Sequence, residues 1–239
     1  MRGVEQRGKF LTLDFGADRI VINAMLTWRL GLARPGAKAL SSTALVLTFG
    51  ARDGLPAGLQ PAAWTVGADW IPADETTVEL RYRDPRKMGK IYLLPAGVTR
   101  EVAGWEALGP DADDEDFGLE AWQSRIKRHN GELQNLLKNQ EFVAGIGNAY
   151  SDEILWAARL SPTQMSTNLD PDEIARLFAA ATTTLRRWTD VRVQETGDGF
   201  PTKVTAFHPD MAVHGKYGEP CRECGAPVQR IVHVGRETN

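Results

Sequence analysis

The hydrophobic pattern of this 239-residue chain changes its period once, and that change limits the fold more than any other feature. Between residues 9 and 98, β-branched and aromatic residues alternate with polar ones, which predicts strands. Gly, Pro and Asp clusters separate these segments, as expected for an antiparallel sheet or sandwich. Past residue 116 the period becomes 3.6, which predicts helices to about residue 194 and an α+β fold. The predicted strands are 9–15, 19–22, 44–49, 78–83 and 90–94.

Charge is distributed unevenly along the chain. The formal net charge is −3, yet residues 101–120 hold eight acidic side chains and no Lys or Arg. Outside that stretch, 28 basic side chains face 23 acidic ones, so the remainder carries +5 and does not exclude nucleic acid. No apolar run reaches the roughly 20 residues of a membrane helix, and no secretory signal begins the chain. We therefore expect a cytoplasmic, nucleoid-associated protein without a membrane partner.

One helix has a clear start signal at Asp170. An Asp at the N-cap, Pro171 at the first helical position and Glu173 at the third predict a capping box. The apolar residues that follow share one helical face, which we expect to be buried. They are Ile174, Leu177, Phe178, Ala181, Leu185 and Trp188.

Residues 143–153 join a helix that is predicted to end near Asn139 to one that starts near Ala149. Two glycines, Gly145 and Gly147, flank one apolar residue, which suits a close approach of bare backbone to a neighbour. The N–H groups of the following helix suit a phosphate, and Asn148 adds a side-chain donor. Asp152 and Glu153 are expected to complement the helix dipole. The alternative interpretation is a tight turn between helices with Asn148 as the cap.

Residues 145–155 (GIGNAYSDEIL) resemble the helix-two-turn-helix signature of the Fpg/Nei family, the formamidopyrimidine-DNA glycosylases and their endonuclease VIII relatives. Further segments are similar to that family's motifs in the same order: 7–11 (RGKFL), 23–30 (NAMLTWRL), 84–89 (DPRKMG), and 214–227 with 234–236 as the first half of a zinc ribbon. The resemblance implies a partial β-sandwich catalytic-type domain at 1–103, an acidic linker at 104–120, a helix-two-turn-helix domain at 121–200 and a truncated zinc-ribbon segment at 201–239.

The resemblance also implies an enzyme of base excision repair, a DNA glycosylase with abasic-site lyase activity. Its partner is double-stranded DNA with an oxidised base or an abasic site, and we expect a monomer. The damaged nucleotide has to leave the stack before its glycosidic bond can be reached. The loop carrying Leu26 matches the intercalating position, with Met25 beside it. Met88 replaces a Phe wedge, and Arg86 matches the contact to the orphaned base. Core packing is the alternative for the three apolar residues.

Other positions are implied as contacts to the DNA backbone. Lys9 matches a supporting catalytic Lys near the lesion phosphate, although a solvated Lys at a strand end is the simpler interpretation. Glu141 stands where many relatives have Lys, and its charge is unfavourable beside a phosphate. The implied DNA-binding residues of this group are Gly145, Gly147, Asn148 and Arg236, and a nearby basic cluster comprises Arg125, Lys127, Arg128 and Lys138.

Cys221 and Cys224 are implied as two of the four thiolate ligands of one zinc ion. Two thiolates do not close a tetrahedral site, so we expect the chain not to hold the ion. Ligation by His208, His214 or His233 is an alternative, and a redox C-x-x-C pair is another.

The family's nucleophile, an N-terminal Pro followed by a Glu, has no counterpart before residues 7–11. We therefore expect a chain shortened at both ends that binds damaged DNA weakly and shows no turnover. One alternative is a catalytically dead DNA-binding module. Another is an RNA- or DNA-binding scaffold that retains only the helix-two-turn-helix element. Oxidised purine and oxidised pyrimidine both remain open as substrates.

Overall fold

The computed structural model describes residues 1–25, 27–50, 58, 61, 71, 75–98, 101–201, 204–233 and 236–239, the side chains of His233 and Arg236 excepted. These residues divide into two compact units. The helical unit comprises Met1–Arg19, Leu94–Val191 and Ala206–Asn239. The strand unit comprises Ile20–Leu93 and Arg192–Thr205.

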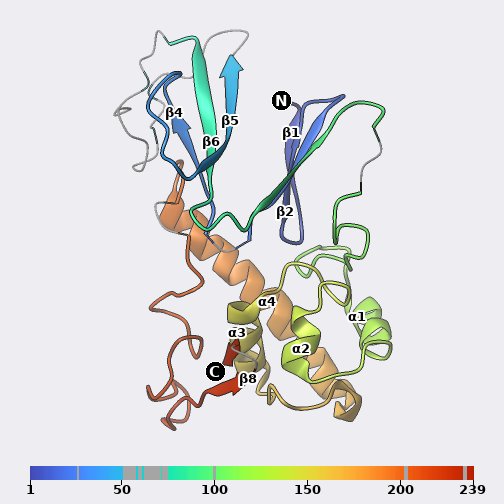
Figure 1. The fold of residues 1–239 in the computed structure, drawn as a ribbon. Helices are drawn as coiled ribbons and strands as arrows, with labels where there is room; N and C mark the ends of the chain where they lie inside the picture. Colours follow the sequence, from blue (N-terminus) through green and yellow to red (C-terminus); the bar gives the residue numbers. More distant parts are fainter. Residues whose placement is uncertain are drawn as a thin grey trace. The chain divides into compact units, whose positions relative to one another are not determined.

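The strand unit contains a three-stranded antiparallel sheet in the order β4-β6-β5 (Figure 1). In it, Leu30 pairs with Tyr82 and Leu47 pairs with Leu80. Along β5, half-buried and exposed residues alternate strictly, because successive side chains of a strand point to opposite faces. The strands of this unit are β3 (Arg19–Asn23), β4 (Arg29–Ala33), β5 (Thr43–Gly50), β6 (Thr77–Arg83) and β7 (Lys90–Leu94).

The helical unit contains a hairpin of β1 (Gly3–Arg7) and β2 (Phe10–Asp14), a set of helices, and a short C-terminal hairpin of β8 (Ile231–His233) and β9 (Arg236–Thr238). Its helices are α1 (Leu119–Ile126), α2 (Leu133–Lys138), α3 (Asn148–Ala158) and α4 (Pro171–Thr196), and a 3₁₀ turn lies at Ser166–Asn168. The aromatic centre of its core is Trp122, whose ring meets Phe142 edge-on at a centroid distance of 5.0 Å. The α+β prediction is confirmed.

Helix α4 begins with the predicted capping box. The N–H of Glu173 donates to Asp170 Oδ1 at 2.7 Å, and the N–H of Asp170 donates to Glu173 Oε2 at 3.1 Å. These bonds satisfy two N–H groups at the helix start. The predicted apolar face is confirmed: Leu177, Ala181 and Trp188 are buried in hydrophobic clusters of the helical unit, and the other three residues are partly buried and pack against the larger cluster.

All five predicted strands are present, and among the described residues up to 98 the strands β1 and β4 are additional. The antiparallel prediction is confirmed for the pairs β1–β2, β4–β6 and β5–β6. The segment predicted as an acidic linker packs closely, because Ala112 and Phe117 are buried in the core formed by α1 to α4. The predicted domain boundaries stay a prediction. Among the described residues, no helix is both long and apolar enough to cross a membrane.

Candidate nucleic-acid interface

The turn between β1 and β2 touches the Gly-rich turn before α3. Gly8 is buried with φ +57°, and a Cβ added to it would lie 3.1 Å from the Ala144 Cβ. Gly145 has φ +94°, and a Cβ added there would lie 4.0 Å from the Gly8 Cα. Backbone therefore meets backbone at this point, and both positions need glycine for its freedom in the left-handed region. The sequence pattern predicted a close approach to some neighbour, and in the structure that neighbour is Gly8.

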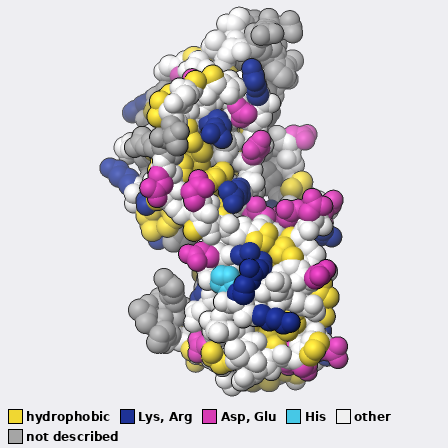
Figure 2. Space-filling view, turned by 90° about the vertical axis from the view of Figure 1, so that its right-hand side faces the viewer, with side chains coloured by type: hydrophobic (Ala, Val, Ile, Leu, Met, Phe, Trp, Pro, Cys, Tyr) yellow, Lys and Arg dark blue, Asp and Glu magenta, His cyan; other side chains and the backbone are white. Residues whose placement is uncertain are grey.

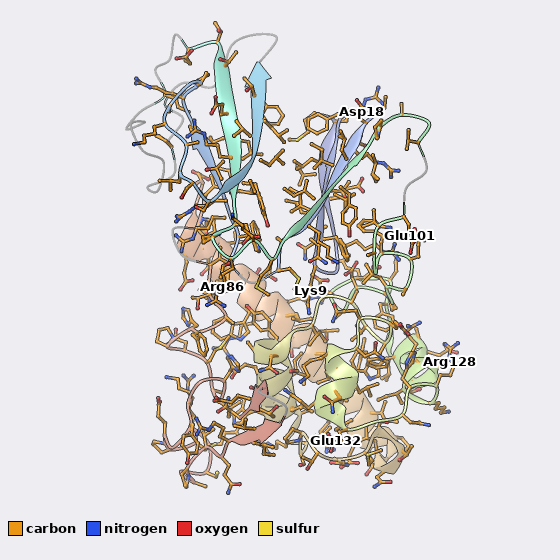
Figure 3. The ribbon with its side chains drawn as sticks, in the orientation of Figure 1. Lys9, Asp18, Arg86, Glu101, Arg128 and Glu132 are labelled. Carbon is orange, nitrogen blue, oxygen red and sulfur yellow. The ribbon has the colours of Figure 1, made fainter. Side chains whose placement is uncertain are left out.

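This contact places Lys9 beside the first turn of α3. A Cβ added to Gly147, the N-cap residue, would lie 3.7 Å from the Lys9 Nζ. The first N–H groups of a helix lack partners within the helix, and that end carries a partial positive charge. Desolvation by the surrounding protein lowers the pKa of Lys9, although part of its side chain stays exposed (Figure 3). An ammonium group and a helix N-terminus thus lie together, an arrangement that suits an anion.

Asn148 is the first residue of α3, and its amide links three elements. The side-chain oxygen accepts hydrogen bonds from Lys138 Nζ at 3.3 Å and from Gln134 Nε2 at 3.4 Å. The side-chain nitrogen donates to the Glu237 carbonyl of β9 at 2.6 Å. The N-cap is Gly147, so the alternative in which Asn148 caps the helix is wrong. Phosphate binding by Asn148 stays a prediction.

Asp152 and Glu153 have a different role from the expected one. Both are buried in the second turn of α3, so the predicted pairing with the helix dipole is wrong. Glu153 accepts hydrogen bonds from three successive backbone N–H groups, those of Ala212, Val213 and His214, at 2.8 to 3.0 Å. Asp152 lies 2.7 Å from His214 Nδ1. These carboxylates fasten the C-terminal segment to α3. The sequence signal was two adjacent acids in an otherwise apolar stretch of helix.

The predicted basic cluster is only partly available to a ligand. Arg125 donates to the carbonyls of Phe142 at 2.7 Å and of Glu141, and burial lowers its pKa, so it fastens the chain before the Gly-rich turn. Lys127 and Arg128 are exposed, as is Glu141. On the face shown in Figure 2, Lys and Arg side chains gather in the lower part of the view beside a histidine. Of the predicted cluster, Lys127 and Arg128 (labelled in Figure 3) are therefore the cations whose side chains are open to a ligand.

In the strand unit, two loops meet at a buried carboxylate. Asp84 accepts hydrogen bonds from the Gly89 N–H at 2.7 Å and from the Thr27 hydroxyl at 3.4 Å. Buried in this way, Asp84 joins the loop after β3 to the loop after β6. A Cβ added to Gly89 would lie 2.3 Å from the Tyr82 hydroxyl, so a larger residue there would require Tyr82 to shift.

The side chains predicted to enter the DNA stack lie on these loops. Met25 is 50% exposed and Met88 is 41% exposed, so the alternative of core packing is wrong for both. Arg86 is exposed as well (Figure 3). Met25 and Lys87 hold left-handed backbone conformations, with φ values of +53° and +52°, which turn the chain sharply at each loop. Leu26 lies outside the described residues.

Cys221 and Cys224 lie in one tight turn with free thiols. The Cys221 carbonyl accepts the Gly225 N–H at 2.9 Å, and its N–H donates to the Ala226 carbonyl at 2.7 Å. Hydrogen bonds from the backbone of Cys224 and Glu223, and from the Trp156 side chain, lower the pKa of Cys221 to about 7. The His214 ring pairs with Asp152, and within the described part of the chain no three His, Cys, Asp or Glu residues form a metal-binding group. The side chain of Arg236 is outside the description; its backbone belongs to β9.

Comparison with known proteins first defines the class. The sequence family described as "Formamidopyrimidine-DNA glycosylase H2TH domain" matches residues 108–198, from the acidic segment through α4. The chain is 32% identical to a formamidopyrimidine-DNA glycosylase of Thermomicrobium roseum over 98% of its own length and 78% of the relative. It is 28% identical to that of Enterococcus faecalis over its full length and 77% of the relative. The chain belongs to the formamidopyrimidine-DNA glycosylase family, which is a family of enzymes.

Solved structures agree with this assignment. A complex between a Lactococcus lactis FPG mutant and a Fapy-dG containing DNA has a TM-score of 0.73 at 26% identity, covering 99% of this chain and 78% of that one. A structure of MutM in complex with carbocyclic 8-oxo-G containing DNA has a TM-score of 0.72 at 25% identity, with the same coverage.

Proposed function

We propose that this chain recognises damaged sites in double-stranded DNA as part of base excision repair, with the glycosylase and abasic-site lyase chemistry of its family. The observation that carries the proposal is the placement of the Lys9 ammonium beside the first turn of α3. Phosphate is the anion that duplex DNA presents, and Lys side chains and helix N-termini are common partners for it. Gly147 and Asn148 would contribute backbone and amide donors, and Arg236 a further cation. Gly145 would contribute the close approach of bare backbone, since its own N–H donates to Gln140 Oε1 at 3.1 Å.

The strand unit would supply the contacts that follow base flipping. An exposed pair of methionines, Met25 and Met88, offers apolar wedges, and unstacking a base costs a few kcal/mol that such a wedge offsets in part. Arg86, exposed on the same loop as Met88, would contact the orphaned base. Insertion of these two methionines into a DNA stack would remove their apolar surface from water, which is favourable.

Fluorescence anisotropy tests the binding. Five duplexes would be compared: intact, with a tetrahydrofuran abasic analogue, with Fapy-dG, with 8-oxoguanine, and with an oxidised pyrimidine. We expect tighter binding to the abasic analogue than to intact DNA, and the two classes of oxidised base decide the substrate preference. Equal affinity for all five duplexes would contradict the proposed function.

Borohydride trapping on abasic DNA tests the chemistry separately. Reduction of an imine joins the protein covalently to the sugar, so a cross-link requires an amine of this chain at the abasic carbon. The yield of cross-linked protein therefore measures whether this chain supplies such an amine. Lesion-specific binding without a cross-link would support the catalytically dead module, and an efficient cross-link would support an active enzyme.

For zinc, we propose that Cys221 and Cys224 supply two of four ligands and do not retain the ion by themselves. Their shared turn and the lowered pKa of Cys221 suit thiolate ligation, and bound zinc would give this segment structural support. The described residues offer only these two thiolates. Elemental analysis of the purified chain should find much less than one zinc per molecule. Alkylation of Cys221 should proceed at neutral pH with and without added zinc, and stoichiometric zinc with protected thiols would contradict the proposal.

A further inference from the structure

Residues 109–112 of the acidic segment run alongside the Gly-rich turn and hold it by its backbone. The Gly109 N–H donates to the Gln140 carbonyl at 2.8 Å, and the Ala144 N–H donates to the Pro110 carbonyl at 2.8 Å. The Ala112 N–H returns to the Ala144 carbonyl at 3.3 Å, so Asp111 and Ala144 form a parallel bridge. A Cβ added to Gly109 would lie 2.6 Å from the Glu141 carbonyl oxygen. We call residues 109–112 the strap.

The strap reaches the Lys9 turn through one side chain. Asp111 Oδ1 accepts the backbone N–H of Gly8 at 2.5 Å, across 103 residues of sequence. Gly8 is buried against Ala144 and Leu108, where an unpaired N–H would be costly. The carboxylate of Asp111 therefore fixes Gly8, the residue that precedes Lys9. The backbone of Asp111 pairs with Ala144, in the turn that precedes α3.

We propose that Asp111 is a positioning residue for the DNA-backbone site, because its carboxylate holds the Gly8 N–H and thereby keeps the Lys9 ammonium beside the first turn of α3. The proposal rests on the proposed function. It also accounts for an acid close to a site for phosphate, where negative charge by itself is unfavourable. What the site requires at residue 111 is the acceptor oxygen, and an amide supplies one without the charge.

The test uses the full chain and the duplex with the tetrahydrofuran analogue. Asp111→Ala removes the acceptor, so we expect affinity to fall about tenfold and the slope of log K against log salt to flatten by about one, as for loss of one phosphate contact. Asp111→Asn keeps an acceptor and should stay within about twofold of the wild type with an unchanged slope. Asp113→Ala is the matched control, since this neighbouring acid also lines the cavity of about 350 Å³ next to Asp111 and Gln6 but makes no bond to Gly8.

A double-mutant cycle separates positioning from general structural support. In a Lys9→Ala background, Asp111→Ala should cause no further loss of affinity, because the group that it positions is already gone. Additive losses, or a wild-type salt slope in Asp111→Ala, would overturn the proposal. If Asp111→Ala does not fold by circular dichroism, Asp111→Asn decides alone, and an altered salt slope in that variant contradicts the acceptor role. Failure of the wild type to prefer the abasic duplex would instead count against the proposed function.

Discussion

The two candidate contact regions are built in opposite ways. In the helical unit, the Lys9 site depends on buried backbone: Gly8 against Gly145, with the strap bonded to both turns. In the strand unit, the candidate contacts are exposed side chains on two loops that are joined beneath by Asp84. A substitution in the first region should therefore change the fold and the site together. A substitution at an exposed side chain of the second should change recognition with little effect on stability.

The largest effect is expected for Gly8→Ala. A left-handed backbone costs a non-glycine residue about 1–2 kcal/mol of the free energy of unfolding. Overpacking against Ala144 should lower that free energy by about another 1–3 kcal/mol. Gly97→Ala is the matched control, because Gly97 has φ +72° and nothing within 4 Å of an added Cβ. Urea denaturation should show a clearly greater loss for Gly8→Ala. Equal losses would mean that the contact with Ala144 contributes nothing.

Asp84→Ala tests the buried link of the strand unit. Two donors, the Gly89 N–H and the Thr27 hydroxyl, lose their acceptor, so we expect a loss of about 2 kcal/mol in the free energy of unfolding. The preference for the abasic duplex should fall as well, because Arg86 and Met88 lie on the loop that Asp84 holds. Unfolding and anisotropy measurements on one preparation check both effects. A destabilised variant with unchanged lesion preference would separate the loop anchor from recognition.

Arg86→Ala should leave stability within about 0.5 kcal/mol of the wild type, because the side chain is exposed. It should weaken the preference for the abasic duplex by about 1 kcal/mol, as expected for a base contact. Lys127→Ala should instead lower affinity for every duplex and flatten the salt slope by about one. Salt titrations on abasic and intact DNA distinguish the two patterns, and identical behaviour of the two variants would count against the role assigned to Arg86.

The smallest effect concerns the pH dependence of stability at Asp111. Desolvation first, and the charges of Asp113 and Asp114 in addition, raise the pKa of Asp111 against the opposing effects of the Gly8 N–H and Arg7. A carboxyl whose pKa is higher folded than unfolded favours the fold when protonated, and that contribution is lost as pH rises through the folded pKa. The stability of the wild type relative to Asp111→Asn should therefore decline between acidic and neutral pH. Urea midpoints measured across that range should converge at the acidic end, and a constant difference would contradict the shift.

Local sequence signals predicted the elements well. Period-two segments became β2, β3, β5, β6 and β7, and the signals at Asp170 became the start of α4. Strands β1 and β4 were not predicted, because β1 (GVEQR) has one large apolar residue and β4 (RLGLA) is interrupted by a glycine. The role of the two acids in α3 was predicted wrongly. Their spacing places Asp152 and Glu153 near a helix start, but their burial depends on the distant residues 212–214, which local sequence does not reveal.

The sequence by itself determined the period of each segment, the glycines at the turns and the family motifs, because these depend on neighbours in the chain. Only the tertiary structure decided that Gly8 meets Gly145, that Lys9 lies beside α3, and that an apparent acidic linker is a strap whose Asp111 holds the Lys9 turn. The physical reason is that a hydrogen bond between Gly8 and Asp111 joins residues 103 positions apart. Propensity and periodicity carry no information at that range, and packing alone selects the partner.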